Sequence, residues 1–134
     1  MSTETTASVS THILDTSIGR PAEGVAIALS ARTGLDGRWA ALGGSATDAD
    51  GRCKDLPALP EGTTHVRLDF ETESYFVDKN RSTQQAEAQQ DAPRVRDSGA
   101  FFPEVTITFA VTPGEHYHVP LLLNPFGYSV YRGS

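Results

Sequence analysis

The sequence has little of what marks several large classes of protein. Its single cysteine, Cys53, excludes an intramolecular disulfide and is compatible with a reducing compartment. Basic residues are also few, with 11 Lys and Arg against 17 Asp and Glu, and a net charge of -6. This balance leaves no basic surface for nucleic acid or for an anionic membrane, so an anionic ligand would have to meet locally placed arginines.

Long apolar stretches are missing as well. No run approaches the ~18 to 20 apolar residues of a membrane span. The first ten residues are rich in Ser and Thr, without the basic leader and apolar segment of a signal peptide. We therefore expect a cytoplasmic protein whose residues 1–10 form a flexible tail.

The rest of the chain is patterned for β-structure. With 134 residues and 38% hydrophobic content, it suits one domain over residues 11–134. Apolar and polar residues alternate over residues 63–70 and 105–111, and turn residues recur about every ten positions. Seven or eight short strands are expected, which favours an all-β fold, an antiparallel sandwich of two sheets.

Two segments depart from the strand pattern. Residues 72–78 predict one short helix, with Thr72 as its N-cap and an acidic residue in the first turn. Residues 80–98 are dense in Gln, Ala, Asp and Ser and almost free of large apolar residues. They predict a long polar loop insertion.

The last nineteen residues concentrate the chemistry. In a strand, His116 and His118 would point to one side while Tyr117 and Val119 point to the other. Residues 124–127 carry turn chemistry, so residues 128–134 should return beside the histidine strand as a hairpin. A positioned imidazole can take or give a proton near neutral pH, which makes this strand a candidate site.

Four segments together resemble the transthyretin-like 5-hydroxyisourate hydrolases. The C-terminal pair of motifs, His-Tyr-His-Val-Pro and the final Tyr-Arg-Gly-Ser, is present without substitution. The other matching segments are THILDTSIGRPA at residues 11–22, DADGR at residues 48–52 and FFPEV at residues 101–105. The resemblance covers nearly everything from residue 11 onward. The 80–98 insertion is the clearest departure, since the resemblance implies that the family crosses this region with a shorter loop.

The resemblance implies a fold, an activity and a state of assembly. The fold is the prealbumin-like sandwich of two sheets, which agrees with the strand pattern. The activity is hydrolysis of the cyclic amide of 5-hydroxyisourate to 2-oxo-4-hydroxy-4-carboxy-5-ureidoimidazoline, a step of urate degradation. The family works without a cofactor or a metal, as homotetramers whose active sites lie where subunits meet.

The resemblance also assigns site residues. His12, Arg52, His118 and Ser134 are the implied catalytic residues, and His116, Tyr131 and Arg132 join His12 and Arg52 in binding substrate. Chemically, one imidazole would activate water while Arg52 stabilises the oxyanion. Ser134 could orient the water or a histidine. Spacing alone leaves open whether His12 or His118 is the base.

Other interpretations of the same residues are weaker. His-x-His plus a distant histidine is also zinc-ligand spacing, but no acidic or cysteine ligand is obviously paired with it. A non-enzymatic carrier like transthyretin would lack the terminal tetrapeptide and the His/Arg set. This chain has both. Cys53 is more simply a small apolar residue than a nucleophile, and His65 an ordinary strand histidine.

Overall fold

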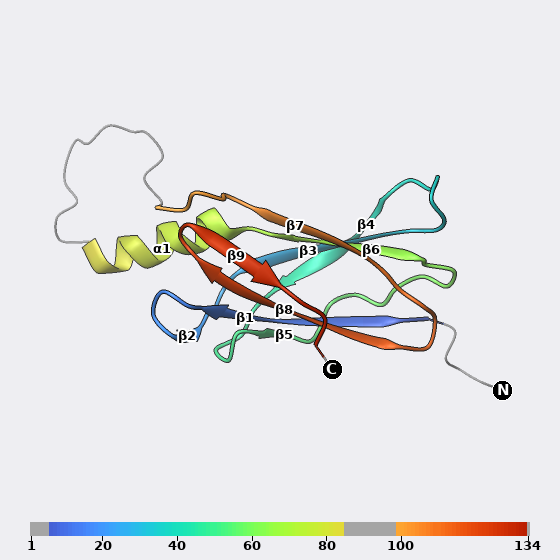
Figure 1. Ribbon diagram of the computed structural model, residues 1–134, viewed down its shortest axis with the longest axis horizontal. Coiled ribbons are helices and arrows are strands. Elements are labelled where there is room, and N and C mark those ends of the chain that lie inside the picture. The colour runs from blue at the N-terminus through green and yellow to red at the C-terminus, as the bar shows by residue number, and fades with distance from the viewer. Residues whose placement is uncertain (1–5, 85–98, 134) are drawn as a thin grey trace.

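The computed structural model describes residues 6–84 and 99–133. Two sheets lie face to face around a shared core (Figure 1). The first contains β1 (Ser8–Asp15), β2 (Arg20–Pro21), β5 (Arg52–Cys53), β8 (His116–Asn124) and β9 (Gly127–Val130). The second contains β3 (Ala26–Arg32), β4 (Ala40–Ala46), β6 (His65–Phe70) and β7 (Val105–Ala110). The predicted all-β sandwich of two sheets is confirmed.

Alternation of side chains decides which face of each strand is buried. In β6, Val66, Leu68 and Phe70 are fully buried, whereas the residues between them are half-exposed. In β8, Leu121 and Leu123 enter the same core from the opposite sheet. The inward faces of the two sheets therefore form the core, and side chains on the outward faces are available to contact solvent or a ligand.

One strand pair runs parallel rather than antiparallel. β1 pairs with β8 over eight residues, from Ser8 opposite His116 to Asp15 opposite Leu123. The other paired strands are antiparallel, as in the β8–β9 hairpin. A tight turn forces antiparallel direction, but β1 and β8 lie about a hundred residues apart and are free of that constraint.

The N-terminal boundary differs from the predicted tail. We expected a tail over residues 1–10, but β1 begins at Ser8, whose backbone N–H donates to the carbonyl of Glu115 at 3.0 Å. Pairing with β8 supplies the hydrogen bonds that a free tail lacks, and Val9 reaches the core. Residues 1–5 lie outside the described part of the chain.

The helix is longer than predicted. α1 extends over Thr72–Gln84, so residues 80–84 of the expected loop are helical, while residues 85–98 lie outside the described chain. Thr72 is its first helical residue and donates its hydroxyl to the carbonyl of Phe102 instead of capping the helix. Two side chains attach α1 to the sandwich. Phe76 packs in the core, and the Tyr75 hydroxyl donates a hydrogen bond to the Asp15 carboxylate. Within the described residues, no helix has the length and apolar character needed to cross a membrane.

A tight turn before β5 holds that strand against β1. Gly51 has a φ of 76°, and its carbonyl accepts a 2.8 Å hydrogen bond from the N–H of Ile13. A Cβ at this position would lie 2.5 Å from the Ile13 carbonyl oxygen. The turn therefore needs glycine both for its conformation and for its close approach to β1.

Replacing Gly51 should destabilise the protein more than replacing a glycine in open space. Gly24 has a similar φ of 82° but nothing within 4 Å of its added Cβ. We expect Gly24→Ala to lower the free energy of unfolding by about 1–2 kcal/mol from backbone strain alone. Gly51→Ala should cost at least about 1 kcal/mol more, because the Ile13 backbone must shift. Urea unfolding followed by circular dichroism measures both, and equal losses would contradict this account.

Candidate active site

The outward face of the first sheet gathers most of the predicted site. In the parallel pair β1–β8, Ser10 lies opposite His118 and His12 lies opposite Pro120. Arg52 pairs with His12 from the other side of β1. Cross-strand partners share a face of the sheet, so the imidazoles of β1 and β8 and the guanidinium of β5 project from the same side.

The turn between β4 and β5 positions both Arg52 and His12. The Asp48 carboxylate accepts hydrogen bonds from the backbone N–H groups of Asp50 at 2.9 Å and of Arg52 at 3.0 Å. The bond from Arg52 is the main reason that the pKa of Asp48 is lowered. Nε2 of His12 lies 3.0 Å from the carbonyl oxygen of Asp50. A carbonyl can only accept, so this nitrogen carries a proton, and in the neutral ring Nδ1 of His12 keeps its lone pair.

His118 is held by its other ring nitrogen. Its Nδ1 lies 2.9 Å from the hydroxyl oxygen of Ser10, which leaves Nε2 for a reactant. Partial burial lowers the pKa of His118, and the nearby His12, His116 and Arg52 lower it further. The neutral ring, which can accept a proton, is therefore favoured at neutral pH.

The C-terminal segment lies against the histidine strand as predicted. Gly133 bridges to His118, donating its N–H to the His118 carbonyl at 2.7 Å, and Tyr131 approaches the carbonyl of Pro120 in the same way. A Cβ on Gly133 would lie 3.0 Å from Cδ2 of His118, so a larger residue would press on the imidazole. Tyr131 is 57% exposed. Ser134 lies outside the described residues.

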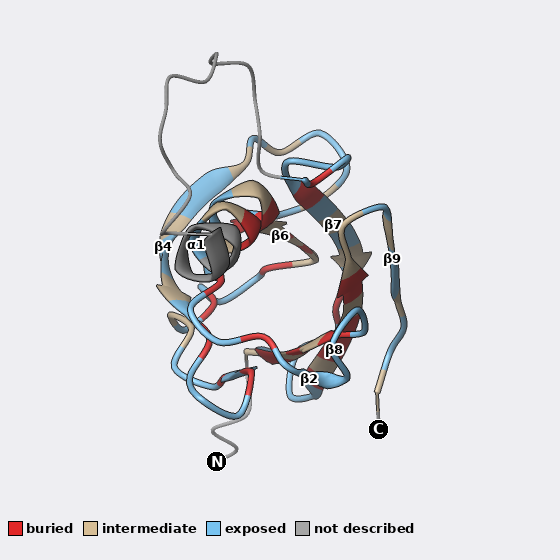
Figure 2. Ribbon diagram, turned by 90° about the vertical axis from the view of Figure 1, so that its left-hand side faces the viewer, coloured by how far each residue is buried: buried red, intermediate tan, exposed pale blue. Residues whose placement is uncertain are grey.

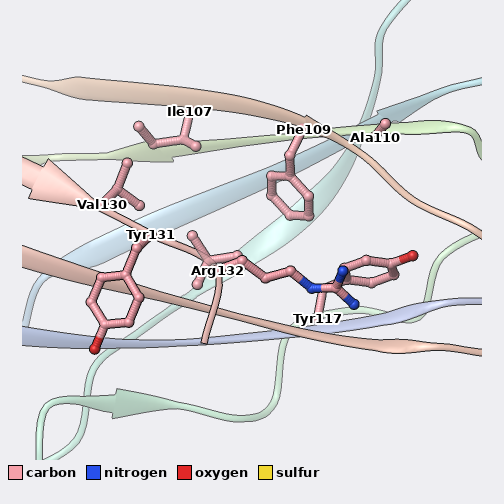
Figure 3. A pocket seen from close by; sticks show the side chains of 8 residues that line it. Ile107, Phe109, Ala110, Tyr117, Val130, Tyr131 and Arg132 are labelled. Atoms are coloured by element: carbon pink, nitrogen blue, oxygen red, sulfur yellow. The ribbon is translucent and has the colours of Figure 1, made fainter. Parts of the chain in front are cut away.

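Arg132 lies on the other side of this segment from the imidazoles. Its guanidinium stacks 4.6 Å above the ring of Tyr117, a core-facing residue of β8, and pairs with Glu115 at 3.3 Å. Figure 3 shows Arg132 extending toward Tyr117, whereas the ring of Tyr131 points away from Val130. The structure thus brings together His12, Arg52, His116, His118 and the Tyr131 backbone. It turns Arg132 toward Tyr117, at the edge of the sandwich between β7 and the C-terminal segment.

That edge holds a pocket of about 250 Å³ between β7 and the C-terminal segment. Its walls are mainly apolar, and they are formed by Ile107, Phe109, Ala110, Tyr117, Val119, Val130, Tyr131 and Arg132 (Figure 3). It lies on the core-facing side of β8, so it is separate from the face that carries the imidazoles. It offers apolar contact but no paired acid and base.

The weaker sequence interpretations find little support in the geometry. Cys53 pairs with Thr11 on the core side and is 1% exposed, and burial raises the pKa of its thiol, which disfavours a nucleophilic thiolate. His65 lies on the second sheet, 2.8 Å from the Thr64 hydroxyl. In the part of the chain that is described, no three His, Cys, Asp or Glu side chains are grouped so that they could hold a metal ion.

Sequence reasoning missed Ser8 and Ser10. Both lie on the outward face of β1, in the segment expected to be a tail, and both contact the imidazole of His116. The alternation Ser8, Ser10, His12 was the available signal, because a strand places all three on one side.

Comparisons with known proteins identify the family of this chain. The model of the HIUase/Transthyretin family matches residues 9–133. The chain is similar to a 5-hydroxyisourate hydrolase of Salmonella dublin, with 39% identity over 94% of this chain and 80% of that protein. Its structure is similar to that of the Klebsiella pneumoniae 5-hydroxyisourate hydrolase, with a TM-score of 0.66 and 34% identity over 96% and 94% of the two chains. It is also similar to Sparus aurata transthyretin, with a TM-score of 0.70 and 27% identity over 93% and 95%. The chain therefore belongs to the HIUase/Transthyretin family.

Proposed function

We propose that this protein is a 5-hydroxyisourate hydrolase that acts in urate degradation. The observation that carries the proposal is the convergence of His12, Arg52 and His118 on one outward sheet face. The two imidazoles each present one unoccupied nitrogen, and Arg52 is exposed beside them. Relatives that carry this enzyme name, such as the Salmonella dublin protein, support the same activity.

The residues divide the work of opening a cyclic amide. His118 takes a proton from water through Nε2, since its lowered pKa keeps the ring neutral. Arg52 faces the carbonyl and stabilises the oxyanion that forms when water adds. His12, in its neutral form, orients the substrate by accepting a hydrogen bond from a ring N–H at Nδ1. Tyr131 and His116 border the bound ring. Ser134 follows Gly133 and is proposed to orient the water.

We further propose that the enzyme is a cytoplasmic homotetramer with sites where subunits meet. Large aromatic side chains are exposed around the β8–β9 hairpin, with Phe126 77% and Tyr128 41% exposed. β7 and β9 each lie at one edge of their sheet, and Figure 2 shows β9 on the opposite side of the sandwich from β4. Exposed edges and aromatic residues favour association with another copy. The unpaired, buried Cys53 suits a reducing compartment.

The activity is tested by the loss of 5-hydroxyisourate absorbance, with substrate made in place from urate by uricase. The wild-type protein should accelerate this loss above the spontaneous rate, and a chelator should not change it. His118→Ala should lower kcat by about 10²- to 10⁴-fold, and Arg52→Gln by about 10²- to 10³-fold. His65→Ala, on the other sheet, should retain activity. No acceleration by folded wild-type protein would favour a carrier, and loss with chelator would favour a zinc enzyme.

The pH profile tests the assignment of His118. Since burial and the neighbouring His12, His116 and Arg52 lower its pKa, the neutral base persists below the ordinary value of 6.5. Protonation then removes the base as the pH falls further, so the acid limb of kcat/KM should lie below 6.5 after the spontaneous rate is subtracted. An acid limb above 7 would show that His118 is not the base.

The assembly is tested by light scattering after size-exclusion chromatography. The wild-type protein should have four times the 14.4 kDa mass of the chain. Phe126→Asp should reduce this mass, because a charge on the hairpin opposes burial there. Leu35→Asp is a matched control, since Leu35 is also 77% exposed but lies in the β3–β4 loop. An unchanged mass in Phe126→Asp would place the interface elsewhere.

A further inference from the structure

A single hydroxyl lies between the two imidazoles of β8. The Ser10 oxygen is 2.9 Å from Nδ1 of His118 and 2.9 Å from Nε2 of His116. At the far side of His116, Nδ1 lies 2.6 Å from the Ser8 hydroxyl. These contacts form a continuous chain from the proposed base to an exposed end of the sheet.

The valence of the hydroxyl couples the two rings. Ser10 has one proton, so it can donate to only one imidazole and must accept from the other. If His118 donates from Nδ1, then Ser10 donates to Nε2 of His116, and Nε2 of His118 is left as a base. If the chain reverses, Ser10 donates to His118, and Nε2 of His118 carries a proton that it can give away. The tautomer of His118 is thus tied to that of His116.

The surroundings disfavour a proton at the inner end of this chain. His118 is partly buried and is faced by His12, His116 and Arg52, all of which oppose a proton on its ring. His116 is exposed, with Ser8 and solvent around its ring. Ser10 itself is only 9% exposed, so its hydroxyl is held between the rings and has little access to water.

We propose that Ser10 is a positioning residue that couples His118 to His116, so that His118 serves both as base and as acid. As water adds to the amide carbonyl, Nε2 of His118 takes one water proton. The proton on Nδ1 of His118 moves to Ser10, and the Ser10 proton moves to Nε2 of His116, which becomes the cation. When the ring C–N bond breaks, the leaving nitrogen takes the Nε2 proton of His118, and the two transfers reverse. One water is consumed, and each residue regains its first state.

This inference rests on the proposed function but can be tested apart from it. The first readout is the ¹⁵N resonances of the imidazole nitrogens in histidine-labelled protein, titrated without substrate. In the wild-type protein His116 and His118 should titrate as a coupled pair. In Ser10→Ala only the charge repulsion between the two rings should remain, so their coupling should be weaker than in the wild type. Ser10→Thr, which keeps a hydroxyl, should restore the wild-type coupling. Identical titrations in the wild type and Ser10→Ala would overturn the inference, whether or not the protein is a hydrolase.

The second readout is turnover. Ser10→Ala should lower kcat by about 10- to 100-fold, part of what acid–base catalysis contributes, with KM changed less than about threefold. His116→Gln should have a similar effect, and the double variant should be no slower than either one, because the three groups act as a unit. Ser30→Ala is the matched control, since Ser30 is 5% exposed on the outward side of the other sheet, and it should keep full activity.

The outcomes separate the two proposals. Absence of turnover in the wild type together with coupled titration would remove the hydrolase and keep the relay. Full turnover in Ser10→Ala would keep the hydrolase and remove the relay. If Ser10→Ala does not fold, Ser10→Cys, which keeps the size and weakens the hydrogen bond, takes its place, with the same loss of kcat expected and full kcat overturning the inference.

Discussion

The site depends on the parallel pairing of β1 with β8. Eight consecutive residue pairs fix the register, and that register alone decides that Ser10 lies beside His118. A slip of one residue would turn the whole outward set of one strand toward the core, where imidazoles have no partners. The buried faces prevent this slip, because Ile13, Leu121 and Leu123 are fully enclosed on the inward side. The same strand register therefore sets both the packing of the core and the geometry of the site.

Two short segments complete the site from either side of this pair. The turn at residues 48–52 brings Arg52 to His12, and its carboxylate at Asp48 organises the backbone that meets the His12 ring. On the other side the C-terminal segment bonds to the backbone of β8, with Gly133 against His118. Backbone hydrogen bonds tie each segment to the central pair, from the Ile13 N–H to the Gly51 carbonyl and from the Gly133 N–H to the His118 carbonyl.

The sequence predicted the local parts of this arrangement well. The alternation along residues 116–123 correctly placed Tyr117 inward and His118 outward, and the turn at residues 124–127 correctly returned the chain. It was wrong where distant partners decide the outcome. The sequence of residues 8–10 does not by itself predict a strand. These residues form part of β1 because they pair with residues 116–118 of β8. Residues 80–84 include no apolar residue in the sequence, yet the backbone continues a helix whose first turns are anchored by Tyr75 and Phe76.

The sequence by itself determined the fold class and the residue types of the site. Alternation, turn residues and the neighbouring histidines are properties of short stretches, so they can be recognised without knowing what lies beside them. The tertiary structure alone decided that β1 runs parallel to β8, that Ser10 joins His116 to His118, and that Arg132 turns toward Tyr117. The first two features depend on the pairing of strands that lie about a hundred residues apart in the sequence. The burial of both sheets in one core selects that pairing.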